Sequence, residues 1–169
     1  LFFFFKDALK FDKFSVLKFL FGGVLISIHW YLFFYSIKIS SISLTLSVLS
    51  TASLMASFLE PLFYKRSFMI HELLFGLVAI IGLSVIFGIQ SENYFAIFIS
   101  LICTLLSVLF SLLNGYLIKK HSSFQISFYE IIFGFFIISL LIIFSDIKLP
   151  KPSSIKISNW IYIFILGSL

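Results

Sequence analysis

The sequence predicts an all-α fold, a polytopic bundle of transmembrane helices. The chain of 169 residues is 61% hydrophobic, carries only 11% charged residues, and groups its apolar residues in runs of about twenty. A hydrocarbon core of about 30 Å needs roughly 20 apolar residues per helix. An average soluble domain has about 25% charged residues, so this composition argues against a soluble fold.

The predicted spans are separated by short connections that carry charged or turn-forming residues. We place five complete spans at 16–37, 42–63, 70–89, 94–118 and 124–144, and the start of a sixth at 158–169. The chain begins with LFFFFKD and stops within the apolar run IYIFILGSL, so we expect an internal fragment of a longer chain. The connections hold, in order, Lys13 and Lys18, Lys38 with Ser40 and Ser41, Lys65 and Arg66, Ser91 to Asn93, Lys119 to His121, and Asp146 to Lys156.

The basic residues predict how the chain is oriented. If alternate connections lie on opposite sides of the membrane, one side carries eight Lys and Arg residues and the other carries four. Cytoplasmic connections normally hold the excess. We therefore predict a multi-pass protein of the cell (inner) membrane, with the connections at 6–18, 65–66 and 119–121 in the cytoplasm. Because the basic residues are scattered, the net charge of +5 does not indicate a nucleic-acid partner.

The span 42–63 is unusually rich in hydroxyl side chains. A helical rotation of about 100° per residue puts most of them within one arc of about 160°. A lone strand is disfavoured because it would expose unpaired backbone to lipid. Small residues on the opposite side, Thr45, Ala52 and Ala56 with Ser41, suit close helix packing. The predicted hydroxyl face consists of Ser40, Ser43, Ser47, Ser50, Thr51, Ser53 and Ser57.

The span 94–118 carries a second polar stripe, in which Ser100, Thr104, Ser107, Ser111 and Asn114 lie within about 80°. Two explanations stay open. The stripes line a shared water-accessible pathway, or the hydroxyls bond carbonyls one turn back and let helices pack closely. On the first explanation, the substrate cavity is formed by His29, Ser43, Ser47, Ser50, Thr51, Ser57, Ser107, Ser111 and Asn114.

Two ionisable residues lie within predicted spans. An ionisable group inside a membrane is a functional candidate because its charged form is costly to bury. We therefore name His29 and Glu130 as candidate proton-coupling residues. The alternatives are a hydrogen-bonded packing role for His29 and, for Glu130, snorkelling toward the basic connection at 119–120. Glu60, near a predicted span end, is expected to pair with Lys65 or Arg66.

Motifs for catalysis or metal binding are missing from the sequence. His71 and Glu72 begin like the zinc-protease motif HExxH, but position 75 is Phe. Cys103 is the single cysteine, and no nucleotide-binding loop, paired-Asp motif or serine-hydrolase elbow occurs. We expect a protein that is not an enzyme and that uses no metal and no cofactor.

The segment 29–88 combines features in a specific order. A hydroxyl-rich helix carries Pro61 in its later half, Glu72 follows, and the next span is punctuated by Gly76, Gly82 and Gly88. This order resembles the EamA family of the drug/metabolite transporter superfamily. The stretch SFYEIIFGF around Glu130 looks like the second helix of that family's second repeat.

The resemblance implies ten helices in two inverted five-helix repeats around a central cavity. Residues 1–89 would then be the C-terminal part of the first repeat, from the end of helix 2 to helix 5. Residues 90–169 would be the N-terminal part of the second repeat, from helix 6 to the start of helix 8.

On this basis we expect an exporter of small metabolites, such as amino acids or related amphipathic compounds, that works by alternating access. The expected partners are the lipid bilayer and a small-molecule substrate, with a proton and a second copy of the chain in a homodimer as candidate further partners. The first alternative is a non-transporting membrane scaffold or assembly subunit in which the hydroxyl stripes only pack helices. The second is an intramembrane lipid-modifying enzyme.

Overall fold

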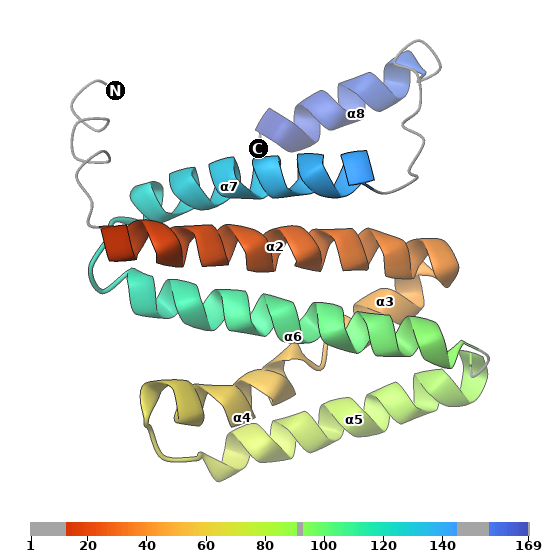
Figure 1. Ribbon diagram of the computed structural model, residues 1–169. Coiled ribbons are helices and arrows are strands. Elements are labelled where there is room, and N and C mark those ends of the chain that lie inside the picture. Colours follow the sequence, from red (N-terminus) through yellow and green to blue (C-terminus); the bar gives the residue numbers. More distant parts are fainter. Residues whose placement is uncertain (1–12, 91–92, 145–155, 169) are drawn as a thin grey trace. The chain divides into compact units, whose positions relative to one another are not determined.

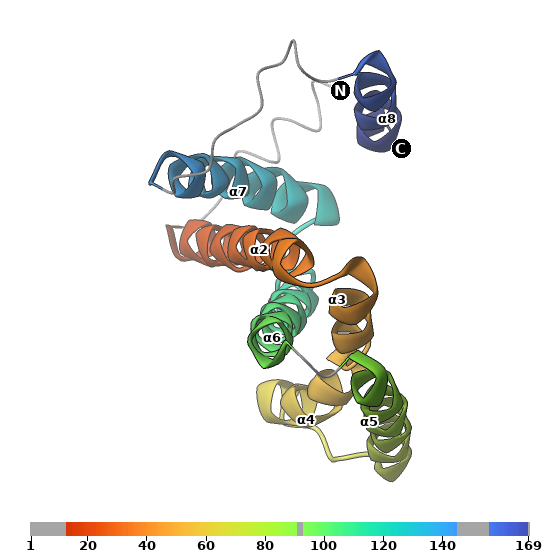
Figure 2. The same ribbon diagram turned by 90° about the vertical axis from the view of Figure 1, so that its right-hand side faces the viewer.

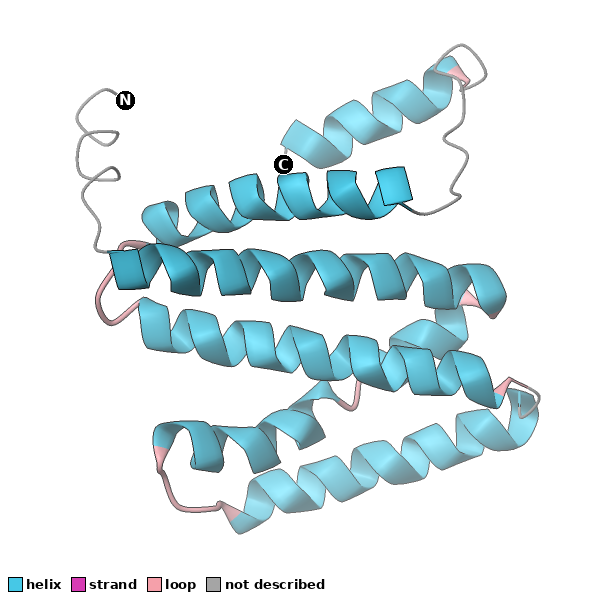
Figure 3. Ribbon diagram, viewed as in Figure 1, coloured by secondary structure: helices cyan, strands magenta, loops and turns pink. Residues whose placement is uncertain are grey.

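The computed structural model describes residues 13–90, 93–144 and 156–168, and no strand occurs among them. The all-α prediction is therefore confirmed for this part of the chain (Figure 3). Its helices are α2 (Lys13–Ile39), α3 (Ile42–Leu49), α4 (Ala52–Tyr64), α5 (Ile70–Gln90), α6 (Tyr94–Leu117), α7 (Ser123–Phe144) and α8 (Ile157–Ser168), labelled in Figure 1.

Four stretches of the described chain are long and apolar enough to cross a membrane. They are α2, the pair α3 and α4 taken together over Ile42–Tyr64, α6, and α7. The membrane-helix prediction is thus confirmed at these four places. The third predicted span coincides with α5, whose apolar segment Ile70–Gly82 is shorter. Much of the connections predicted at 6–18 and 146–156 lies outside the described residues.

The prediction of one continuous helix over 42–63 is wrong at Ser50 and Thr51. Ser50 caps the end of α3, and Thr51 caps the start of α4. The Thr51 amide and hydroxyl both donate to the Val48 carbonyl, at 3.0 and 2.6 Å. The Ser50 hydroxyl donates to the Ser47 carbonyl at 2.6 Å. Hydroxyls that bond nearby carbonyls compete with the helical ladder and bend helices, which explains the break.

Contacts divide the chain into two compact units, Leu1–Ile138 and Ser139–Leu169. The predicted repeat boundary at 89/90 falls inside the first unit. The second unit contains the end of α7 together with α8, whose Ile157, Trp160 and Phe164 are exposed. Every site described below lies in the first unit.

Helices α2 and α6 lie side by side and run in opposite directions (Figure 1). Around them, Phe19, Leu25, Leu113, Leu117 and Ile126 form a buried apolar cluster. Asn93, at the start of α6, accepts a hydrogen bond from the Ala96 amide and donates one to the Ile39 carbonyl. One side chain thus caps α6 and ties it to the end of α2.

Helix α4 lies next to both α6 and α5 (Figures 1 and 2). A Cβ at Gly76 of α5 would collide with the Leu54 side chain, so the glycine allows α5 to approach α4 closely. Helix α4 ends at Lys65, which has φ 54° and whose amide donates to the Pro61 carbonyl. This left-handed residue turns the chain toward α5 and places Arg66 at the turn.

Candidate functional site

Glu130 and Asn114 form the most unusual polar contact in the described part of the chain. The Asn114 side-chain amide of α6 donates to Glu130 Oε2 of α7 at 3.2 Å. Glu130 is only 4% exposed although it lies inside an apolar helix. Among the described residues, neither Glu130 Oε1 nor Asn114 Oδ1 has a hydrogen-bond partner. Such groups are costly to bury, so this pair is a candidate for function rather than for stability alone.

The Glu130 carboxyl occupies a space that a glycine leaves open. A Cβ at Gly22 of α2 would overlap Glu130 Oε1. At the next residue, a Cβ at Gly23 would lie 2.7 Å from the Phe133 Cβ. The Ser27 hydroxyl lies 2.6 Å from the Gly23 carbonyl and 3.1 Å from the Gly134 carbonyl, so it joins α2 to α7. Small residues thus bring these two helices together around the carboxyl.

A cavity of about 350 Å³ lies beside this crossing. Its polar walls are Ser27, Ser127 and Glu130, and its aromatic walls are Trp30, Phe110 and Phe135. The snorkelling alternative for Glu130 places the carboxyl at the membrane surface. The hydrogen bond to Asn114 and the position against Gly22 instead hold it between three helices.

His29 occupies a different place from Glu130. Its ring is buried toward α6, where Nδ1 lies 2.9 Å from the Cys103 carbonyl and 3.2 Å from the Cys103 sulfur. Because a carbonyl can only accept, Nδ1 carries the hydrogen. The ring also contacts Trp30 and Phe33. His29 lines neither the cavity beside Glu130 nor the α4–α6 cavity, and these contacts favour its packing role.

Most predicted hydroxyl residues make hydrogen bonds within their own helical segment. The hydroxyl of Ser47 donates to the Ser43 carbonyl at 2.7 Å, and that of Ser57 to the Leu54 carbonyl at 2.7 Å. In α6, the Ser107 hydroxyl donates to the Thr104 carbonyl at 2.8 Å. These bonds are the ones that the packing alternative requires, because they satisfy the hydroxyls without water.

Some of the same residues nevertheless line a cavity of about 450 Å³ between α4 and α6. Ser107 and Ser111 of the α6 stripe line it. The other wall comes from α4, with Ala52, Ser53, Ala56, Glu60 and Tyr64. The predicted cavity residues Ser43, Ser47 and Ser50, which precede α4, do not line this cavity. Because α3 and α4 are separate helices, a face assigned from one continuous helix does not apply across Ser50 and Thr51.

A hydroxyl cluster joins α2, α3 and α6. The Ser36 hydroxyl lies 2.9 Å from the Thr45 hydroxyl and 2.5 Å from the Ser100 hydroxyl, and all three residues are fully buried. Sequence reasoning assigned Thr45 and Ser100 to separate stripes. Their meeting through Ser36 depends on how three helices cross, for which the sequence carries no signal.

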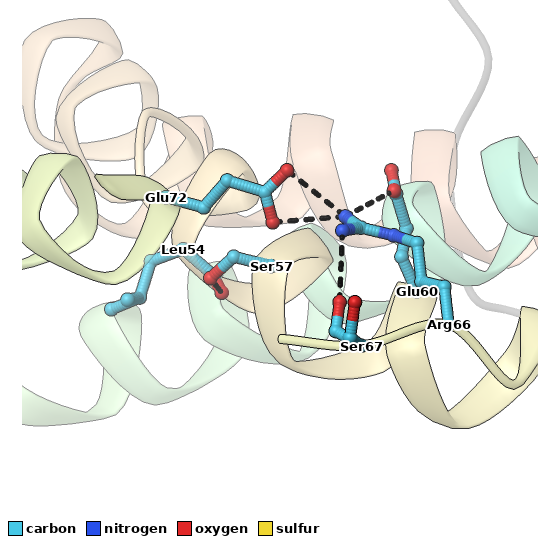
Figure 4. Close-up of polar contacts among 6 residues, drawn as sticks. All are labelled: Leu54, Ser57, Glu60, Arg66, Ser67 and Glu72. Atoms are coloured by element: carbon cyan, nitrogen blue, oxygen red, sulfur yellow. Dashed lines mark hydrogen bonds and ion pairs between the residues drawn. The ribbon is translucent and has the colours of Figure 1, made fainter. Parts of the chain in front are cut away.

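Arg66 joins two carboxylates at the turn between α4 and α5 (Figure 4). Its Nη2 lies 2.8 Å from Glu60 Oε2 and 2.9 Å from Glu72 Oε2. The predicted pairing of Glu60 with a basic residue of this turn is confirmed, and the partner is Arg66. Hydrogen bonds to Glu72 and then to Glu60 raise the pKa of Arg66, so its charge persists. Sequence reasoning missed Glu72 in this cluster.

A third cavity, of about 300 Å³, lies against this ion cluster. Three charged residues, two serines, Ala56 and Phe75 line it. Within the described ranges, no three His, Cys, Asp or Glu side chains lie close enough together to hold a metal ion.

Comparison of the chain with protein-family models, with curated proteins and with solved structures gives no match. The interpretation of these sites therefore rests on their geometry and chemistry.

Proposed function

We propose that this chain is part of a multi-pass transporter of the cell (inner) membrane that exports small metabolites by alternating access. The observation that carries the proposal is the Glu130 carboxyl, buried at a close helix crossing and next to a cavity. A carboxyl in this position is expensive to retain for packing alone. Its presence is accounted for if it binds and releases a proton during a transport cycle.

The chemistry of the Glu130 and Asn114 pair suits proton exchange. An ionised carboxyl accepts from the Asn114 amide nitrogen, which is the contact in the structure. A protonated carboxyl is also a donor, and the amide oxygen of Asn114 is an acceptor that has no partner among the described residues. Asn114 can therefore stabilise Glu130 in both protonation states, and the proton is the proposed coupling ion.

The cavity between α4 and α6 is the proposed substrate path. Ser107 and Ser111 supply hydroxyls on one wall, and Ser53 and Glu60 supply polar groups on the other. Its volume of about 450 Å³ lies in the range of sites for small organic ligands. The substrates proposed are amino acids or related amphipathic compounds.

We place the chain in the EamA family as part of the same proposal. In this scheme the full protein has ten helices in two inverted five-helix repeats, and residues 1–89 and 90–169 belong to successive repeats. The likeness in the sequence 29–88 supports this assignment, as do the glycine contacts at Gly76. The turn at 65–66 would face the cytoplasm, where an exporter takes up its substrate.

A second candidate function is a membrane scaffold or assembly subunit that does not transport. The local hydrogen bonds of Ser47, Ser57 and Ser107 favour it, because they leave these hydroxyls satisfied without substrate or water. A scaffold gives no account of Glu130 Oε1, which has no hydrogen-bond partner within the described ranges.

Efflux from inside-loaded cells separates the two functions. Cells producing the protein are loaded with a panel of labelled metabolites, and efflux is measured with and without a proton gradient. Transport predicts efflux of at least one compound above that of empty cells. It also predicts that E130Q removes the gradient dependence, whereas E130D retains part of it because its carboxyl still titrates. Efflux equal to that of empty cells over the whole panel would favour the scaffold.

A further inference from the structure

The ion cluster at the α4–α5 turn has features that a purely structural ion pair does not require. Glu60, Arg66 and Glu72 line a cavity instead of being covered by apolar side chains. Their side chains are 38%, 26% and 26% exposed, so each charge is accessible from the cavity or from solvent. Exposed ion pairs of this kind contribute little to stability, and stability alone gives no reason for a cavity at this place.

The bonding of Arg66 leaves it able to accept a further anionic partner. Its hydrogen bonds to both Glu60 and Glu72 go through Nη2. Its Nη1 has a long contact of 3.5 Å to the Ser67 carbonyl, visible in Figure 4. A guanidinium carries five donors in a planar fork that fits a carboxylate in bidentate fashion. A ligand carboxylate can therefore join Arg66 without displacing Glu72.

Glu60 is the member of the cluster that a ligand can reach from two sides. Together with Ser53 and Ala56 it lines both the cavity at the turn and the cavity between α4 and α6. The ion pair of Glu60 with Arg66 uses a single carboxylate oxygen, Oε2. An incoming ammonium group can compete with Arg66 for this carboxylate, because Glu72 continues to balance the Arg66 charge.

The arrangement of opposite charges specifies one class of ligand. Arg66 Nη2 and Glu60 Oε2 lie 2.8 Å apart. A ligand that binds both residues must therefore carry its ammonium and its carboxylate close together. An α-amino acid carries these two groups on a single carbon. The cavity volume of about 300 Å³ is at the small end for ligand sites. Ala56 and Phe75 make the remaining wall apolar, which suits an uncharged side chain.

We propose that Glu60 and Arg66 bind the ammonium and the carboxylate of a small α-amino acid with an uncharged side chain. Glu72 is a positioning residue that holds the Arg66 guanidinium. The two cavities that share Glu60 then form consecutive parts of one path along α4. This inference narrows the substrate class of the proposed transporter and therefore rests on the proposed function for its biological meaning, although binding itself can be measured independently.

Binding of matched probes to the purified full protein tests the proposal. The probes are L-leucine, 3-methylbutylamine, which lacks the carboxylate, and 4-methylpentanoate, which lacks the ammonium. Isothermal titration is the measurement. L-leucine is expected to bind at least about tenfold more tightly than either partial analogue, since each charge-assisted hydrogen bond supplies about one such factor. No binding of L-leucine, or equal binding of the amine, would overturn the proposal.

Variants locate the site. E60Q and R66Q are each expected to weaken L-leucine binding by about tenfold or more. K65N is the matched control, because it removes the adjacent charge and asparagine tolerates the left-handed backbone at Lys65. Weakening by K65N equal to that by R66Q would mean that the general positive charge of the turn, not this site, attracts the ligand. The comparison of probes on the unsubstituted protein stays decisive even if a variant fails to fold.

The outcomes also separate this site from the proposed function. L-leucine binding that depends on Glu60, without any efflux, would leave the site standing and remove the transport function. Efflux that persists unchanged in E60Q would leave transport standing and remove the site.

Discussion

The carboxyl of Glu130 lies in the space that a side chain at Gly22 would fill. This relationship joins two helices that are far apart in the sequence: Glu130 Oε1 lies against Gly22, while the other carboxyl oxygen, Oε2, accepts from Asn114. It makes Gly22 the residue through which the placement of Glu130 can be tested without changing Glu130 itself.

G22A is expected to lower the free energy of unfolding by about 1–3 kcal/mol, the usual cost of overpacking. The added methyl group would overlap Glu130 Oε1, so the carboxyl must leave its contact with Asn114. G82A is the control, because a Cβ there meets no atom within 4 Å. In a helix interior this control should be neutral or stabilising by up to about 1 kcal/mol.

Thermal or chemical unfolding in detergent measures both changes. The double variant G22A/E130A is expected to recover part of the loss, since the methyl group then has room. Equal unfolding of G22A and G82A would show that the carboxyl is not held against Gly22.

S36A is expected to cost about 1–3 kcal/mol in the free energy of unfolding. It removes the hydroxyl that bridges Thr45 and Ser100, and both partners are fully buried. Each of the two lost hydrogen bonds contributes about 0.5–1.5 kcal/mol, while Thr45 and Ser100 keep their own bonds to the Ser41 and Ala96 carbonyls. S84A is the matched control because Ser84 is exposed and bonds only the Ile80 carbonyl of its own helix. A cost for S84A as large as that for S36A would contradict this account.

Thiol labelling tests whether the cavity between α4 and α6 contains water. In a C103S background, single cysteines at Ser107 and Ser111 are expected to react with a membrane-impermeant reagent because both positions line this cavity. A cysteine at Leu113, in the buried apolar cluster, is the control and should stay unlabelled. Protection at 107 and 111 equal to that at 113 would mean that the α6 stripe serves packing.

The ion cluster at the α4–α5 turn is expected to persist at alkaline pH. Its hydrogen bonds to Glu72 and Glu60 raise the pKa of Arg66 above the ordinary value. A group whose pKa is higher in the folded state stabilises that state below its unfolded pKa and loses the effect only as pH rises through the folded value. The difference in unfolding midpoint between the protein and R66Q should therefore stay constant from about pH 7 to about pH 10. A difference that disappears within this interval would contradict the raised pKa of Arg66 in the folded protein.

The helices were predictable because their signal is local. Each predicted span coincides within a few residues with one or two helices, from α2 at Lys13–Ile39 to α7 at Ser123–Phe144. A run of apolar residues long enough to cross a bilayer forms a helix because a helix hydrogen-bonds its own backbone groups, which lipid cannot do. The break at Ser50 and Thr51 was not predictable in the same way. Hydroxyl-rich helices occur both straight and bent, and the sequence does not decide between them.

The individual polar residues were also recognisable, but their partners were not. Glu130, Asn114 and Glu60 were selected because a polar side chain in an apolar run is unusual. Only the structure pairs Glu130 with Asn114, places it against Gly22, and adds Glu72 to the pair of Glu60 and Arg66.

By itself, the sequence determined that the chain is helical and apolar enough for a membrane, and which residues are chemically unusual within it. Those properties depend on neighbours along the chain. The tertiary structure alone decided which side of each helix meets which other helix, and hence that Ser36 bridges Thr45 to Ser100 and that His29 meets Cys103 instead of Glu130. The physical reason is that helix rotation and crossing are set by how glycines and side chains interlock between helices, which a periodic pattern in one helix does not contain.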